Sequence, residues 1–166
     1  MVAEGTPKDF KSLLENEAVA KCGDDLKRQM NILSAEGIEL KGRLYDIGLM
    51  HYLVDPEKSH KIDILAQSCL GLSLAVQEAG QEAATGSLFD DMPSDEALSD
   101  RSREAVILLM LKDKLQEELS RKVPSTSSGS GESPLIDLYE TMEEPLLKVL
   151  SRMERNGVKV DLGSLR

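Results

Sequence analysis

Aromatic residues are scarce in this sequence of 166 residues. They make up 3% of the chain, with no Trp, two Phe and three Tyr, whereas hydrophobic residues of all kinds reach 40%. That apolar content is typical of a globular protein rather than of a disordered one. The core must therefore be aliphatic, built mainly from Leu, Ile, Val and Met.

Paired cysteines and long apolar runs are also missing. Cys22 and Cys69 lie far apart, and neither belongs to a CxxC pair or to a metal-ligand spacing. The amino-terminal residues lack the basic and then apolar run of a signal peptide, and no apolar stretch approaches the length that spans a membrane. We therefore expect buried, reduced thiols in a soluble cytoplasmic protein.

Positive charge is in the minority. Thirty Asp and Glu residues stand against 20 Lys and Arg residues, which gives a net charge of -10. Such a balance opposes tight electrostatic binding of the DNA backbone. The composition predicts weak DNA binding by this chain, or none.

The spacing of apolar residues predicts several helices in the first half of the chain. A short one lies near residues 10–14, and a second covers residues 25–36. A third covers residues 47–54 and stops at Pro56, and a fourth carries its apolar stripe from residue 62 to residue 70. These patterns predict packed amphipathic helices.

Two strands are predicted between these helices. Residues 18–22 favour one, and residues 38–45 alternate well enough for a second that Gly42 interrupts. We expect both to be edge pieces of a larger sheet. Asp46 follows the second strand, and an Asp at a helix start is most often an N-cap.

The second half begins with a weak signal over residues 71–93, which predicts a loop. The longest helix follows from Ser94 to Lys122. Residues 124–134 are rich in Gly, Ser and Pro and predict a flexible linker. The apolar face predicted for the long helix consists of Leu98, Ala105, Leu108, Leu115 and Leu119.

Two short helices are predicted after the linker, separated by a break at Pro145. Gly157 should end the second, and Asp161 is placed to cap a third. The two apolar stripes comprise Leu135, Leu138, Tyr139 and Met142, and then Leu146, Val149, Leu150 and Met153.

This last segment carries a family pattern. Residues 143–146 read E-x-P-L, and residues 149–161 read V-L-x-x-M-E-x-x-G-V-x-x-D. The run from Leu138 to Asp161 resembles the start of the polymerase domain in family A DNA polymerases, the bacterial DNA polymerase I type. The resemblance implies a piece of such a polymerase.

The first half independently resembles the 3′→5′ exonuclease domain of the same family. The matching runs are Leu14–Gly23, Asp25–Ile38, Tyr45–Pro56 and His60–Ala66. The resemblance covers nearly the whole chain, but residues 72–98 do not align with the family.

The resemblance implies a fold class and a domain organisation. The fold is α/β, an incomplete ribonuclease H-like exonuclease fold that lacks its amino-terminal strands and is mostly helical in this chain. Residues 1–123 would form a degenerate, N-terminally truncated exonuclease-like domain and residues 124–134 the linker. Residues 135–166 would be short helices that begin the polymerase domain.

Proofreading exonucleases of this family hold two divalent metal ions on clustered carboxylates. The family supplies an Asp-x-Glu pair on its first strand, an Asp after N-L-K-Y, and a Tyr-x-x-x-Asp on a late helix. The first motif is missing here, and Gln29 stands at the ligand position of the second. At the third, Asp100 replaces the Tyr and Glu104 replaces the Asp.

These changes predict that no catalytic residue set is intact and that this chain holds no metal ion and no other cofactor. Mg²⁺ and DNA are expected for the intact polymerase family. The leading hypothesis is a catalytically inactive scaffold beneath the polymerase domain of a DNA polymerase I that acts in replication and repair. The alternatives are an active proofreading exonuclease in the intact parent, or a helical adaptor that binds a protein partner through uncovered Leu- and Met-rich stripes.

His51 and His60 are the two histidines of the chain. Neither has a partner histidine or carboxylate at a metal-ligand spacing in the sequence, so each is predicted to be a packing or surface residue.

Overall fold

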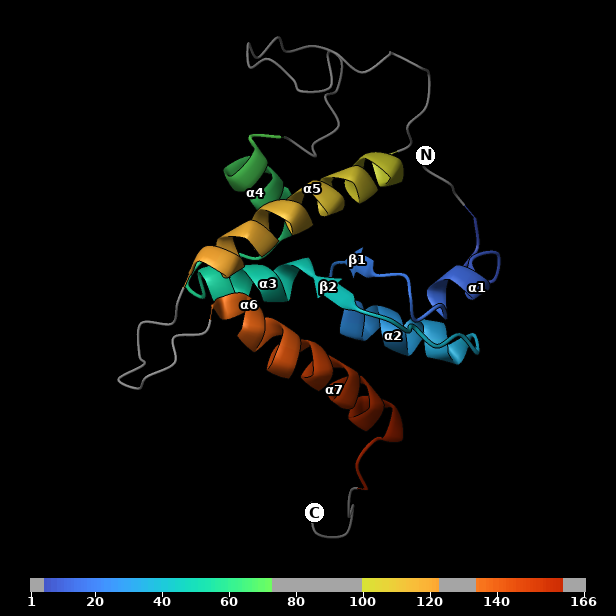
Figure 1. Cartoon of the computed structure of the whole chain (residues 1–166). Helices are drawn as coiled ribbons and strands as arrows, with labels where there is room; N and C mark the ends of the chain where they lie inside the picture. The colour runs from blue at the N-terminus through green and yellow to red at the C-terminus, as the bar shows by residue number, and fades with distance from the viewer. Residues whose placement is uncertain (1–4, 73–99, 123–133, 160–166) are drawn as a thin grey trace, which may run out of the picture.

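The computed structural model describes residues 5–72, 100–122 and 134–159, in which helices dominate around one small parallel sheet (Figure 1). The predicted mostly helical α/β character is therefore confirmed for these residues. In chain order the elements are α1 (Lys11–Leu14), β1 (Lys21–Gly23), α2 (Leu26–Ala35), β2 (Leu44–Asp46), α3 (Ile47–Val54), α4 (Ile62–Leu65), the π-helical turn η1 (Ala66–Leu70), α5 (Asp100–Arg121), α6 (Leu135–Leu138), the π-helical turn η2 (Tyr139–Glu143) and α7 (Glu144–Asn156).

The two strands are shorter than predicted and lie nearer the carboxyl ends of the predicted ranges. β1 and β2 pair in parallel, with Cys22 opposite Tyr45. Residues 38–43 are not a strand, because Gly42 has a φ of 86° and passes so close to residue 19 that a Cβ there would lie 2.5 Å from its carbonyl oxygen. This stretch instead buries Ile38 and Leu40.

The predictions for the first helices are confirmed. α2 begins after Asp25, whose side chain accepts a hydrogen bond from Arg28 N at 3.3 Å, and Gly37 follows its end with a positive φ. α3 has the predicted bounds, and the stripe predicted for the next helix is buried at Ile62 and Leu65. Local capping and apolar spacing were therefore sufficient here.

The face predicted for the long helix is wrong in part. α5 buries Ile107, Leu111, Leu115 and Leu119, which are spaced four residues apart, whereas Ala105 is exposed. α3 packs against α5 and covers that row, which the spacing within α5 alone could not select. Residues 93–99 and Leu98 among them lie outside the described residues.

The predicted break at Pro145 is also wrong. α6, η2 and α7 follow one another without a gap, and Pro145 lies in the first turn of α7. The π-helical turn η2 directly precedes this position, and the helical backbone continues through the proline instead of stopping at it. Gly157 ends α7 as predicted, with a φ of 67°.

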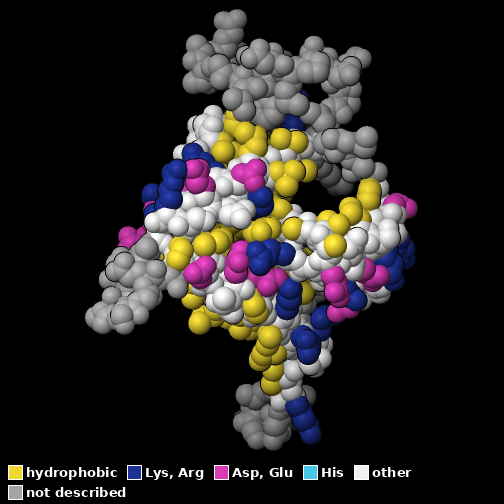
Figure 2. All heavy atoms as spheres, in the orientation of Figure 1, with side chains coloured by type: hydrophobic (Ala, Val, Ile, Leu, Met, Phe, Trp, Pro, Cys, Tyr) yellow, Lys and Arg dark blue, Asp and Glu magenta, His cyan; other side chains and the backbone are white. Residues whose placement is uncertain are grey.

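α7 turns much of its apolar surface to solvent. Leu147 and Ser151 face the protein, whereas the predicted stripe on α7 is between 39% and 60% exposed. Figure 2 shows hydrophobic side chains gathered along the lower part of the view, over the region of α7. We call this surface the α7 stripe; with Met142 of η2 it comprises Met142, Leu146, Val149, Leu150 and Met153.

Two clusters of buried side chains form the core, and the C-terminal segment contributes to both. Tyr139 belongs to the cluster formed by β2, α3, α4, η1 and α5. Leu147 belongs to the cluster formed by α2, residues 38–40 and β2. The elements on both sides of the predicted linker are therefore packed together.

Several predicted features lie outside the described residues. They are the loop and unaligned stretch at residues 73–98, nearly all of the linker at residues 124–134, and Asp161. Within the described parts, no helix is both long and apolar enough to cross a membrane.

Candidate functional site

Acidic side chains gather at the carboxyl ends of the two parallel strands, the edge at which α/β sheets commonly bind ligands. Asp46 ends β2, and Asp24 and Asp25 follow β1. A Cβ at Gly48 would lie 3.4 Å from Asp24 Oδ1 and 3.5 Å from Asp46 Oδ1, so two carboxylates flank the start of α3. We call this place the strand edge.

Asp46 serves the fold at the strand edge. Its side chain is buried and accepts hydrogen bonds from Leu26 N at 2.7 Å and Leu49 N at 3.1 Å. It therefore caps α3, as predicted, and also receives the first amide of α2. Burial raises the pKa of Asp46, while these two backbone N–H groups lower it.

Asp24 is less well stabilised by its surroundings than Asp46. Burial and then the neighbouring Asp46 and Asp25 raise its pKa, and Glu104 on α5 adds to the effect. Glu104 therefore acts electrostatically on the strand edge, from an exposed position on its helix. The arrangement concentrates several carboxylates at the strand edge.

The structure places the predicted motif residues around this edge without assembling a site from them. Gln29 is exposed on α2, and its amide donates to Asp24 O at 2.6 Å. Its side chain thus bonds to backbone and carries no charge. Asp100 is the first described residue of α5, and its side chain lies outside the described part of the structure.

A two-metal centre does not fit the residues that are described. Hard divalent cations require several oxygen ligands, usually carboxylates. Across residues 5–72, 100–122 and 134–159, no three His, Cys, Asp or Glu side chains come together in a way that would hold a metal ion. Asp46 is occupied by helix amides, and Gln29 offers only a neutral amide.

A second concentration of polar contacts lies along the free edge of β2, the side away from β1. Tyr139 is 1% exposed, accepts a hydrogen bond from Asp46 N at 2.8 Å and donates one to Leu44 O at 3.0 Å. Arg43 O accepts from Lys21 N, so residues 44 and 46, on alternate positions, face away from β1. The Tyr139 hydroxyl therefore satisfies the free edge of β2.

Burial raises the pKa of the Tyr139 phenol, which stays neutral and keeps its proton for Leu44 O. Its ring lies parallel to that of Tyr45, with centroids 6.4 Å apart. We call the two hydrogen bonds that the Tyr139 hydroxyl makes with Asp46 N and Leu44 O the Tyr139 pin.

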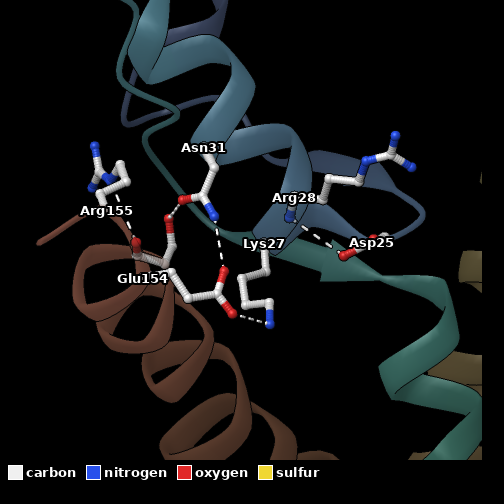
Figure 3. A network of polar contacts seen from close by, with 7 residues as sticks. Asp25, Lys27, Arg28, Asn31, Glu154 and Arg155 are labelled. Carbon is white, nitrogen blue, oxygen red and sulfur yellow. Dashed lines mark hydrogen bonds and ion pairs between the residues drawn. The ribbon is translucent and has the colours of Figure 1, made fainter. Parts of the chain in front are cut away.

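α7 adds a polar network against α2 (Figure 3). Glu154 accepts from Lys27 Nζ at 2.6 Å and from Asn31 Nδ2 at 2.9 Å, and the buried Ser151 hydroxyl donates to Asn31 Oδ1 at 2.7 Å. Arg155 donates to Ser34 Oγ at 2.5 Å. The pin and this network join the C-terminal helices to both β2 and α2.

Residues 2–78 match the family model described as DNA polymerase I, ribonuclease H-like domain. Over 158 residues the chain is 30% identical to DNA polymerase I of Bacillus subtilis, an alignment that covers 95% of this chain and 16% of that protein. The chain is similar to DNA polymerase I over nearly its whole length. The resemblance found in the sequence is thereby confirmed.

Other members of the DNA polymerase I family agree. The enzyme of Mycobacterium tuberculosis strain H37Rv is 32% identical over 165 residues, which cover 96% of this chain and 17% of that protein. The chain therefore spans about a sixth of the length of these relatives.

A solved structure has the same arrangement. It is the POL domain of Pol1 from M. smegmatis in complex with DNA primer-template and dNTP. The match has a TM-score of 0.68 at 28% identity and covers 95% of this chain and 23% of that one.

Tyr139, Asn31 and Ser151 were not singled out as functional from the sequence. Tyr139 was assigned to an apolar stripe, where a tyrosine is indistinguishable from a packing residue. Ser151 offered a weak signal, because a small polar residue four positions after Leu147 marks a close helix contact.

Proposed function

We propose that this chain is the exonuclease-like region and the start of the polymerase domain of a DNA polymerase I that acts in DNA replication and repair. In this proposal the exonuclease-like region is catalytically inactive and serves as a scaffold for the polymerase domain. The observation that carries the scaffold role is the Tyr139 pin, which ties the C-terminal helices to the sheet.

The strand edge supports the proposed loss of catalysis. Gln29 at the second motif is a neutral amide that bonds to Asp24 O, and Glu104 at the third lies exposed. An amide in place of a carboxylate at the second motif weakens the binding of a divalent cation there.

The proposed domain organisation remains that of residues 1–123, 124–134 and 135–166. Each of the two buried clusters includes one side chain from beyond the linker, Tyr139 in one and Leu147 in the other. Such shared cores support a role in positioning the polymerase domain.

The α7 stripe gives this scaffold a surface for the remainder of the polymerase. Five neighbouring apolar side chains at least 39% exposed are more than scattered surface residues. The relatives are about six times as long as this chain, and we assign the stripe to their polymerase body. In the intact parent that body would bind DNA and Mg²⁺. A protein-binding adaptor is the second candidate, favoured by the same stripe.

Proofreading in the intact parent is the remaining alternative. The effect of Glu104 on Asp24 at the strand edge is the observation in its favour. An exonuclease assay of the full chain on single-stranded DNA with Mg²⁺ or Mn²⁺ tests whether the residues of this chain suffice for cleavage.

We expect no cleavage by the wild-type chain, by Glu104→Ala or by Glu117→Ala, which removes a matched exposed carboxylate from the same helix. Cleavage that Glu104→Ala abolishes and Glu117→Ala retains would refute catalytic inactivity. Cleavage that both variants retain equally would identify a contaminating nuclease.

A further inference from the structure

The two histidines of the chain meet in space although nine positions separate them. His51 Nδ1 and His60 Nδ1 are 2.8 Å apart, and the ring centroids are 5.0 Å apart with an angle of 62° between the planes. The prediction that each histidine is a packing or surface residue is confirmed for the buried His51, but it did not include this contact between the two rings. Because the whole sequence contains two histidines, all of its imidazole groups are in this one contact.

The contact closes the turn between α3 and α4. His51 lies in α3 and is 5% exposed, and His60 is half-buried just before α4, with the Tyr52 ring against it at 5.7 Å. Lys58 pairs with Asp55 at 2.8 Å within the turn, and Lys122 donates to Val54 O from the end of α5. These contacts hold residues 55–61 against the helices.

We propose that the His51–His60 contact is a pH-sensitive latch, which holds this turn closed while at most one ring is charged and releases it when both are.

The number of protons on the two rings explains why the turn opens in acid. At 2.8 Å one proton lies between the two Nδ1 atoms, so one ring donates and the other accepts. A first added proton enters at Nε2 of the donating ring and leaves the hydrogen bond intact, now with a charged donor. A second must bind the accepting Nδ1, which places two N–H groups and two positive charges face to face.

Burial assigns the roles. Charging the buried His51 ring is opposed by the loss of its hydration, so His51 is the acceptor and the half-buried His60 is the donor. Burial first, and then the charge of His60, lower the pKa of His51.

The charged groups around His51 act in both directions. Asp55 and Glu118 on α5 favour its protonation, whereas Lys58 opposes it. A base whose pKa is lowered in the folded state destabilises that state as pH falls below its unfolded value, about 6.5 for histidine. The turn is therefore closed at neutral pH and opens in mild acid.

Hydrogen exchange of the full chain tests the latch, with each rate corrected for its intrinsic pH dependence. Between about pH 7.5 and pH 5, we expect the amides of residues 55–62 to lose about tenfold in protection, and those of α2 and α7 to keep theirs. His60→Gln supplies an amide donor that does not titrate and should remove the response. Asp55→Asn removes a neighbouring charge but keeps both rings, so the response should persist.

NMR of the two imidazoles in the wild-type chain provides a second measurement that needs no variant. The latch requires two separate protonation steps, the second at His51 and below the ordinary histidine range. Joint titration of both rings near pH 6.5, about the unperturbed value, would overturn the proposal. So would a loss of protection over residues 55–62 that His60→Gln leaves unchanged.

Discussion

The strand edge and the free edge of β2, the side away from β1, differ in what their polar groups do. At the strand edge, Asp24 lies among other carboxylates that raise its pKa, and Gln29 is turned to a backbone oxygen. At the free edge of β2, the Tyr139 hydroxyl makes hydrogen bonds with two backbone groups, and α7 adds further hydrogen bonds to α2. The strand edge gathers carboxylates without the geometry of a metal site, whereas along the free edge of β2 two backbone groups are paired by one buried hydroxyl.

The difference shows which contacts the fold depends on. Replacing Gln29 or Glu104, the altered motif residues near the strand edge, should cost the fold little, because both side chains are exposed. Removing Tyr139 or Leu147, through which the C-terminal helices join the core, leaves a cavity or an unpaired backbone group. The proposed change from nuclease to scaffold therefore requires no change in the packing.

The largest expected effect is where α7 packs against α2. Leu147→Ala removes a 6% exposed side chain from the cluster around α2, and we expect the free energy of unfolding to fall by about 3 kcal/mol. Leu146→Ala is the matched control, because Leu146 is 42% exposed and should cost under about 0.5 kcal/mol. Urea denaturation of both variants measures the difference, and equal losses would mean that α7 is not packed as described.

Tyr139→Phe keeps the ring and deletes the hydroxyl. Asp46 N and Leu44 O would lose their partner in a buried position, so we expect a loss of about 2 kcal/mol. Tyr52→Phe removes an equivalent hydroxyl from a residue that is 49% exposed and should be close to neutral. A neutral Tyr139→Phe would show that the pin contributes no stability.

Asp24→Asn should stabilise the chain. The folded-state pKa of Asp24 is raised, so its ionised form opposes folding once the pH exceeds the unfolded value near 3.8. We expect a gain in Tm of about 2 °C at neutral pH. The gain should vanish below that unfolded value, where the carboxyl is protonated in both states.

Mg²⁺ sharpens the same comparison. If the strand edge holds no divalent cation, millimolar Mg²⁺ should leave the Tm of the wild type and of Asp24→Asn unchanged. A rise in Tm with Mg²⁺ that Asp24→Asn abolishes would instead establish a metal site there.

Among the destabilising substitutions, the smallest effect is expected for Glu154→Gln. Its ion pair with Lys27 is 2.6 Å long, but both side chains are more than a third exposed, and such pairs contribute little to stability. The Tm should fall by about 1 °C or less in low salt, and by less in high salt. A drop as large as that of Leu147→Ala would contradict the view that packing and the pin dominate this edge.

The elements that the sequence predicted well are those with local determinants. Asp25 and Gly37 bound α2, and Asp46 fixes the start of α3, because caps act within one helical turn. The strands were misplaced because Gly42 and its neighbour across the loop set where β2 begins. The face of α5 was partly wrong because its packing against α3 decides which row is buried.

The site was predictable to a similar extent. Gln29 could be recognised as an altered ligand from its motif alone, and the structure adds that its amide bonds to Asp24 O. The Tyr139 pin could not be found, because an edge hydrogen bond between residues more than 90 positions apart leaves no pattern in sequence. The pairing of His51 with His60, only nine positions apart, was missed because the turn between α3 and α4 brings the rings together without a spacing pattern in the sequence.

Native-state hydrogen exchange of the full chain tests the scaffold most directly, through the opening free energies of α7, α2 and β2. If the C-terminal helices are pinned to the sheet, the most protected amides of α7 and of α2 should exchange through one common opening. Tyr139→Phe should lower both by the same amount. Exchange of α7 through a separate, lower-energy opening that leaves α2 and β2 fully protected would contradict the scaffold.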